Sequence, residues 1–244
     1  GRGWRMLVEC LSAGRGISLP ALGTATGHLA TRMTGAYAYV RQQFGMSIGK
    51  FEGVQESLAR IGGFTYSLEA MRVMTAGAID MKLSPSVVTA IAKYHMTEMS
   101  RTLMNDAFDI HAGRAIQVGP KNYLAHGYMG IPISITVEGA NILTRNLMIF
   151  GQGATRCHPY VLAELQAAQL DDQGAAVTAF DKALFGHIGF AISNFFRTFW
   201  LSLTNAAFSH APVKDETARY YKQMNRFSAS LALMSDIAMA TLGG

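Results

Sequence analysis

Glu138 is an isolated acid in an uncharged part of the sequence. It follows an uncharged run from Asn122 to Val137, within the segment ISITVEGANILTR, and is the first acidic residue after Asp109. A glutamate in the first turn of a helix commonly offsets the helix dipole. A carboxylate in apolar surroundings is also more basic, which suits a group that must accept a proton. The residue types alone leave both roles open, helix-start acid or general base.

Arg41 and Phe44 form a second candidate site, in the stretch YAYVRQQFGMSIGKFEGVQ. Arg41 ends a predicted helix, the Phe-Gly pair breaks it, and a new helix is predicted from about residue 51. A guanidinium pairs bidentately with phosphate and an aromatic ring packs on a flat ligand, so the pair could clamp a phosphate-bearing aromatic molecule. An arginine at a helix end also complements the helix dipole. The residues alone favour neither interpretation.

Two further motifs are interpreted as having no catalytic or metal-binding role. GQGATR, residues 151–156, resembles a Gly-rich phosphate loop, but it lacks the third glycine and follows no predicted strand. It is predicted to be a turn at the end of a helix. Cys157 and His158 are adjacent rather than at zinc-ligand spacing, so no metal site is predicted.

The composition indicates an apolar chain without a nucleic-acid partner. Half of the 244 residues are hydrophobic and 15% are charged, so another domain or subunit is expected to cover part of the surface. The net charge of +5 is scattered rather than clustered, which argues against a nucleic-acid surface. Two cysteines provide no disulfide framework and favour a reducing compartment, so the expected location is cytoplasmic.

The elements that must position the candidate residues are predicted to be helices. From residue 51 to 81, apolar residues recur at intervals of three and four, as on the buried face of a helix. Ser84-Pro85 is typical of a helix start, and a second long helix is predicted through Phe108. An earlier helix is predicted over about residues 6–39, although it contains Pro20.

The remainder is also predicted to be mostly helical. Residues 112–136 are expected to be loop with one short helix at 123–128, followed by a helix from 139 to about 151–153. Three more helices are predicted, over residues 158–169, 175–209 and 214–242. The predicted fold is all-α: an up-and-down helical bundle over residues 1–153 and an additional helical region over 154–244. The apolar run 183–196 contains His187 and Asn194 and is too short to span a membrane.

Taken in order, these stretches resemble the C-terminal helical domain of acyl-CoA dehydrogenases. That family has an Arg-bearing helix, then R-x-x-F-G-x-x-I-x-x-F-Q-x-x-Q, a long helix pair, a Q-I-x-G-G-x-G turn and Y-E-G-T. The corresponding stretches here read LSAGRGISLPA, RQQFGMSIGKFEGVQ, FDIHAGRAI and VEGAN. The match covers about residues 4–150, and the rest resembles the bacterial long-chain-type enzymes of fatty-acid β-oxidation, which carry an extra C-terminal helical region.

The resemblance implies that Glu138 is the catalytic base. In the family this base removes the α-proton of an acyl-CoA thioester while FAD takes a hydride from the β-carbon, which yields a trans-2-enoyl-CoA. Some relatives place the base just before the arginine matched by Arg15, but that position is Gly14 here. Arg15 matches a residue near the acyl-binding end, and the small Gly139 would let the backbone approach the substrate closely.

The resemblance also implies an FAD site. Arg41 and Phe44 match residues that contact FAD across a subunit interface, and Asp109 and Gly113 fall in the flavin-contacting turn. The sequence departs from the family pattern in that turn, because Asp109 replaces a glutamine and Ala112 replaces the first glycine. A carboxylate near a pyrophosphate is unfavourable unless it is paired. The other departures are Glu52, Val137 and Ala140, in place of glutamine, tyrosine and threonine.

The partners implied by the resemblance are a fatty acyl-CoA, an electron-transferring flavoprotein and further copies of the chain in a dimer or tetramer. Family members have an N-terminal helical domain and a middle β-domain that supply much of the flavin site. The chain looks like a piece of a longer enzyme and is expected to be inactive alone. The alternative is a non-catalytic helical assembly module. The aromatic residues around 189–200 favour a buried helix, with a membrane-docking module peripheral to the inner membrane as the alternative.

Overall fold

The chain folds as two compact helical units, Gly1–Gln152 and Gly153–Gly244. The computed structural model describes residues 2–242, without the side chains of residues 4, 5, 7–14, 147 and 242. Ten α-helices and two short segments of 3₁₀- and π-helix are present in this described range, and the only strands in it are two of two residues each. The prediction of an all-α fold is confirmed.

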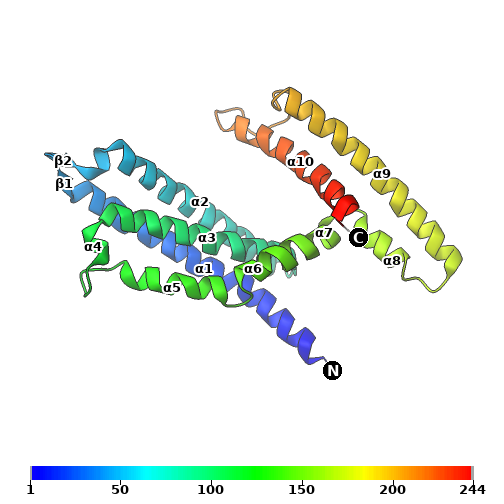
Figure 1. Ribbon diagram of the computed structural model, residues 1–244, viewed down its shortest axis with the longest axis horizontal. Helices are drawn as coiled ribbons and strands as arrows, with labels where there is room; N and C mark the ends of the chain where they lie inside the picture. The colour runs from blue at the N-terminus through cyan, green and yellow to red at the C-terminus, as the bar shows by residue number, and fades with distance from the viewer. Residues whose placement is uncertain (1, 243–244) are drawn as a thin grey trace. The chain divides into compact units, whose positions relative to one another are not determined.

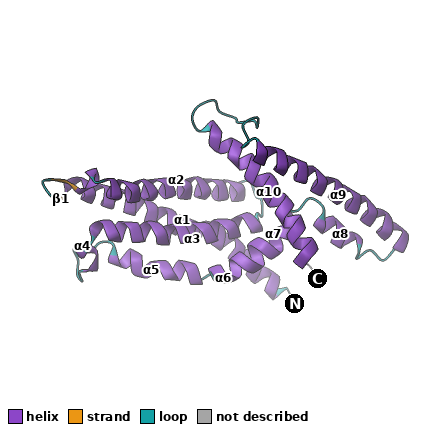
Figure 2. Cartoon of the chain, turned by 45° about the horizontal axis from the view of Figure 1, so that its top comes forward, coloured by secondary structure: helices purple, strands orange, loops and turns teal. Residues whose placement is uncertain are grey.

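Three long helices form the frame of the first unit, as Figures 1 and 2 show. They are α1 (Gly3–Val40), α2 (Glu52–Asp80) and α3 (Ser86–His111), and each packs on the other two. α5 (Ala125–Thr136) covers α3. The core lies between these helices and is apolar, as the periodicity predicted; its fully buried members include Ile61, Leu68, Met96, Leu103 and Met104.

Glycines let α1 approach its neighbours closely. A Cβ added to Gly23 would lie 3.2 Å from the Met96 carbonyl oxygen, and one added to Gly27 would lie 2.9 Å from Thr65 Oγ1. The glycines weaken the helix on its own by about 1 kcal/mol each. The close packing that they permit explains why α1 is nevertheless continuous through Pro20.

The segment after α3 is more helical than the sequence predicted. α4 (Gly113–Ile116) is a single turn, and α5 includes ISIT and Pro132, which were expected to lie in a loop. Ile131 and Ser134 are buried, so packing of this apolar segment overrides its weak helix propensity.

The predicted turn at GQGATR was wrong. α6 (Asn141–Leu143) leads into η2 (Thr144–Gln152), a π-helical segment, and α7 (Gly153–Cys157) follows directly. The backbone is therefore helical through the two glycines, which disfavour a helix without forbidding it. A π-helix is uncommon and occurs frequently beside functional sites.

The second unit is a helical hairpin with a short helix against it. α9 (Gln173–Leu203) pairs with α10 (Ala218–Leu242), and α8 (Val161–Ala167) packs on α9. Asp172 caps α9, since its Oδ1 accepts hydrogen bonds from the amides of Gly174 (2.9 Å) and Ala175 (3.4 Å).

Candidate active site

Glu138 lies in a tight turn between α5 and α6. Its φ is +53° and that of Gly139 is +91°, so two successive residues adopt left-handed backbone conformations. Such a conformation costs a non-glycine residue about 1–2 kcal/mol, and strained residues of this kind cluster at functional sites. The Glu138 charge acts on Arg15 of α1 and on Lys93 of α3.

The Glu138 carboxylate has one buried oxygen and lies close to the charge of Arg15. Its Oε2 is buried and receives no hydrogen bond from any residue in the described part of the chain. Arg15 is 5% exposed, and this burial lowers the pKa of its guanidinium. The nearby charge of Glu138 partly offsets the effect, because it raises the pKa of Arg15. A Cβ on Gly139 would lie 3.6 Å from Arg15 Nη1 and 3.2 Å from Thr144 Oγ1. The structure therefore brings Arg15, Glu138 and Gly139 together.

A buried lysine beneath this turn was not predicted from the sequence. Lys93 is fully buried, and its ammonium donates to the carbonyls of Ile135 (3.1 Å) and Gly139 (2.8 Å) and to Asn141 Oδ1 (2.7 Å). Asn141 Nδ2 in turn donates to the side chains of Thr97 (2.9 Å) and Glu98 (2.7 Å) on α3. The sequence did contain a signal that Lys93 is buried, because it lies three residues before Met96 on the apolar face of α3.

The Phe-Gly pair forms the turn of a small hairpin. β1 (Gln42–Gln43) pairs antiparallel with β2 (Met46–Ser47), which leaves Phe44 and Gly45 as the two turn residues. Both have positive φ, at 53° and 79°, as a type I′ turn requires. The glycine is suited to this conformation, and the phenylalanine ring is left 92% exposed at the tip. An apolar ring held in the open in a strained turn is typical of a contact for a ligand or a partner.

A cavity of about 1020 Å³ lies beside this hairpin, at the end of the bundle where Figure 1 shows α4 next to β1 and β2. All four predicted cofactor residues line it: Arg41, Phe44, Asp109 and Gly113. Arg114 lines it too, so two guanidinium groups accompany the single Asp109 carboxylate. This charge balance and the open aromatic ring fit the phosphates and rings of a dinucleotide such as FAD. Glu52 lies in the first turn of α2, where an acid is favourable.

His111 was missed by the sequence analysis and forms part of the cavity wall. Burial lowers its pKa, which keeps the ring neutral. Its Nδ1 donates to the Ala107 carbonyl (2.8 Å) and its Nε2 accepts from the Tyr123 hydroxyl (2.6 Å). The ring also stacks on Tyr37, with centroids 4.2 Å apart. The adjacent Ala112 has φ +49°, which explains why a glycine is usual at that position in the motif.

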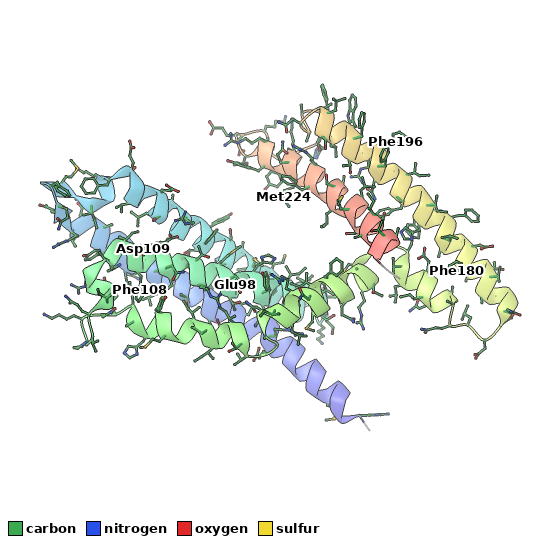
Figure 3. All side chains as sticks on the ribbon, in the orientation of Figure 1. Glu98, Phe108, Asp109, Phe180, Phe196 and Met224 are labelled. Atoms are coloured by element: carbon green, nitrogen blue, oxygen red, sulfur yellow. The ribbon has the colours of Figure 1, made fainter. Side chains whose placement is uncertain are left out.

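The cavity and Glu138 lie at opposite ends of the bundle. Arg15 beside Glu138 and Arg41 in the cavity are both held by α1, 26 residues apart. At 1.5 Å per residue the separation along the helix is about 39 Å. In Figure 3, Asp109 lies toward the α4 end of α3 and Glu98 toward the α6 end. The predicted base and the predicted clamp are therefore not parts of one pocket within a single chain.

A cluster of titratable side chains lies in the second unit. His158 Nε2 is 2.9 Å from Asp236 Oδ1, His187 Nε2 is 3.4 Å from the same oxygen, and His187 Nδ1 is 2.8 Å from Glu164. Three of these groups, His158, His187 and Asp236, are close enough together to hold a metal ion. The backbone amides of Tyr160 and Val161 donate to His158 Nδ1, which places the proton of the neutral ring on Nε2. In that tautomer His158 points an N–H, and not a lone pair, toward Asp236, so its Nε2 cannot bind a metal ion there. The cluster is therefore best described as a set of polar contacts that join α8, α9 and α10.

The cluster predicts that the stability of the protein falls in mild acid. Burial, and then His187, lower the pKa of His158 below its usual value of 6.5. Below that pH the unfolded chain takes up a proton that the folded chain resists, so the free energy of unfolding falls by up to about 1.4 kcal/mol per pH unit. Thermal unfolding measured from about pH 5 to about pH 8, the range in which histidine changes charge, tests this prediction. A His158→Asn variant, which keeps an acceptor for the two amides, should show a flatter profile; an unchanged slope would contradict the assignment.

Comparison with known proteins assigns a class to the fold. The family described as "Acyl-CoA dehydrogenase, C-terminal domain" matches residues 1–150. The family described as "Acyl-CoA dehydrogenase, C-terminal, bacterial type" matches residues 155–244. The described fold is thus that of the C-terminal helical domain of this family. The chain belongs to the acyl-CoA dehydrogenase family, which confirms the resemblance found in the sequence.

Individual relatives agree with this assignment. The probable acyl-CoA dehydrogenase FadE10 of Mycobacterium tuberculosis is 25% identical over 143 residues, 58% of this chain and 22% of the relative, so the chain spans less than a quarter of that protein. Glutaryl-coenzyme A dehydrogenase in a glutaryl-CoA complex matches with a TM-score of 0.59 and 25% identity, over 64% of this chain and 39% of that one. An acyl-CoA dehydrogenase complexed with FAD from Bacillus anthracis matches all of this chain and 45% of its own, with a TM-score of 0.56. At 17% identity, this last match shows the fold.

Proposed function

We propose that the natural full-length protein dehydrogenates a fatty acyl-CoA to the trans-2-enoyl-CoA, with Glu138 as the general base. The observation that carries the proposal is the Glu138 carboxylate, whose buried Oε2 receives no hydrogen bond from the described residues and lies in a strained turn. Oε2 takes the α-proton of the thioester, and the electron pair of that C–H bond becomes the α,β double bond. A second pair leaves the β-carbon as hydride. When bound, FAD accepts that hydride.

The other site residues assist this step without reacting. The buried Arg15 guanidinium places a positive charge beside the Glu138 carboxylate. Gly139 has no side chain to block the thioester from the backbone beside the base. Arg41 and Arg114 offer hydrogen bonds to phosphate oxygens, and Phe44 offers a flat face to a ring.

The distance of about 39 Å between base and clamp, from the rise of α1, favours a shared site between subunits. In a dimer, the clamp of one chain would hold the FAD that serves Glu138 of its partner. The relevant assembly is therefore proposed to be a homo-oligomer, with an electron-transferring flavoprotein as the acceptor of the electrons.

The proposal is tested by mixing the FAD-loaded full-length protein with palmitoyl-CoA under anaerobic conditions. The expected result is loss of the oxidised flavin absorbance together with one equivalent of enoyl-CoA. Stable flavin absorbance with every saturated acyl-CoA, from short to long chains, would reject the proposed function.

A second proposal concerns the hairpin of the second unit, which exposes an apolar surface. α9 is long and apolar enough to cross a membrane by composition, and 6% of its most apolar window is buried. Its exposed large side chains recur at helical spacing: Phe185, Ile188, Ile192, Phe196, Phe199 and Leu203. Figure 3 labels Phe196 on α9 and Met224 on α10. Both side chains are exposed. Two acidic residues lie near the hairpin loop, Asp215 and Glu216. Five basic residues lie there as well: Arg197, Lys214, Arg219, Lys222 and Arg226. We propose that this surface binds an anionic membrane peripherally.

Vesicle co-sedimentation tests the membrane proposal. The chain should sediment with phosphatidylglycerol-containing vesicles and not with phosphatidylcholine vesicles alone, and Phe196→Asp should reduce binding by about tenfold because a charge enters the apolar surface. Ser193→Asp, at an exposed position on another face of α9, is the control. Equal sedimentation of the Phe196 variant and the parent would reject the proposal, and so would a chain that forms oligomers without binding vesicles.

A further inference from the structure

Lys93 occupies an unusual position for a charged side chain. It is fully buried in the middle of α3, yet its three ammonium protons all go to one short segment, residues 135–141. Two of the acceptors flank Glu138: the Ile135 carbonyl precedes it, and the Gly139 carbonyl follows it directly. We infer that Lys93 is a positioning residue that holds the Glu138 carboxylate in its proton-accepting place. The inference rests on the proposed function.

The backbone at Glu138 needs such a support. A left-handed conformation at a non-glycine residue persists only where its surroundings hold it in place. The Gly139 carbonyl accepts from Lys93 (2.8 Å) and also from the Thr144 hydroxyl (3.0 Å), so the peptide after Glu138 is fixed from two sides. Without the Lys93 ammonium the turn is free to relax, and the carboxylate would move with it.

The second anchor of the turn also depends on Lys93. Asn141 Oδ1 accepts from the ammonium, which orients the amide so that its Nδ2 reaches Thr97 Oγ1 and Glu98 Oε1. The first residue of α6 is thereby tied to α3 through three bonds. Both ends of the Glu138 turn are therefore held by one helix, and Lys93 is the residue common to both.

Charged groups from three elements act on Lys93. The charged groups that act on it are Arg15 from α1, Glu98 from α3 and Glu138 from the turn. Burial, and then Arg15, lower the pKa of Lys93 to about 8, so the ammonium is charged at neutral pH and begins to lose its proton in mild alkali. A neutral amine has one donor fewer, and one of the three anchors is then lost.

The test compares Lys93→Met with Lys82→Met in the full-length protein loaded with FAD. Methionine has a similar length and no donor, and Lys82 is an exposed lysine between α2 and α3. Three quantities are measured: the kcat and KM of dehydrogenation, the rate of exchange of the α-hydrogens of palmitoyl-CoA in D₂O without an electron acceptor, and the unfolding transition.

For Lys93→Met we expect kcat and the exchange rate to fall together by about 10- to 100-fold, with KM within about twofold, because a misplaced base slows proton transfer more than it weakens binding. Loss of rate above about pH 8 should occur in the parent and be absent in the variant. Lys82→Met should behave as the parent. An exchange rate within about twofold of the parent in a folded Lys93→Met variant would overturn the inference.

If Lys93→Met does not fold, a second variant tests whether these hydrogen bonds position Glu138. Asn141→Ala leaves Lys93 and Glu138 in place and removes one anchor. It should lower the exchange rate by a few-fold, and an unchanged rate would overturn the inference. If the parent protein itself neither exchanges nor dehydrogenates any acyl-CoA, the proposed function fails instead, and the unfolding transition still reports whether Lys93 stabilises the turn.

Discussion

Replacing Glu138 with glutamine is expected to lower kcat of the full-length, FAD-loaded protein by about 10²- to 10⁴-fold, the usual contribution of a general base. The amide has nearly the same size as the carboxylate and cannot accept the α-proton. The fold should be preserved, because Oε2 receives no hydrogen bond from the described residues that the amide would break. Steady-state dehydrogenation of palmitoyl-CoA with an artificial electron acceptor measures the effect.

The control for this substitution is Glu56→Gln. Glu56 is an exposed glutamate on α2 that contacts Arg60 on the surface, at 3.7 Å. The same chemical change there should leave kcat within about twofold, since exposed ion pairs contribute little. Near-normal turnover by Glu138→Gln, with the fold and the FAD content intact, would show that another group accepts the proton.

Replacing Arg41 with alanine is expected to weaken FAD binding by about 10- to 100-fold, the value of a charge-assisted hydrogen bond to phosphate. Arg41 lines the cavity together with Phe44, and its loss leaves Arg114 as the remaining guanidinium there among the described residues. Fluorescence titration of the apoprotein with FAD measures the change. Arg32→Ala, at an exposed position on α1 away from the cavity, is the matched control and should bind FAD normally.

The Arg41 variant also tests whether the site is shared between subunits. When Arg41→Ala and Glu138→Gln chains are combined in mixed dimers, one site of each mixed dimer joins an intact base to an intact clamp. At an FAD concentration too low to load the Arg41→Ala sites, neither variant alone should be active, and equal mixing should restore about a quarter of the parent activity. If base and clamp act within one chain, mixing restores nothing beyond the sum of the two variants.

The helices could be predicted from the sequence because their signals are local. The three-four spacing over residues 51–81 and the Ser84-Pro85 start correspond to α2 and α3 within a few residues. α5 could not be predicted in the same way, since Pro132 and β-branched residues argue against a helix and burial against α3 overrides them. The π-helix at 144–152 has no local sequence signal at all.

The candidate site was predictable where a motif carries it and not where distant residues meet. Arg41, Phe44, Asp109 and Gly113 were found by motif, and they line one cavity. Lys93 was missed because its role depends on bonds to a segment more than 40 residues later. The position of Lys93 on the buried face of α3 indicates burial, but nothing local identifies its hydrogen-bond partners, since those contacts are made by packing of the bundle.

The histidine–carboxylate cluster was missed for the same reason. His158, His187 and Asp236 come from separate parts of the second unit and meet only when α9 and α10 pack. The adjacent Cys157 and His158 are not at zinc-ligand spacing, so the sequence predicted no site at His158. The hydrogen bonds that decide the tautomer of His158 exist only in the folded chain.

The most direct test of the central claim follows the α-hydrogen itself. Palmitoyl-CoA deuterated at the α-carbon is incubated in H₂O with the FAD-loaded full-length protein, and the deuterium content is followed by mass spectrometry. We expect loss of one of the two α-deuterons with the parent protein and retention of both with Glu138→Gln. Loss of the deuteron at the parent rate in the Glu138→Gln variant would contradict it.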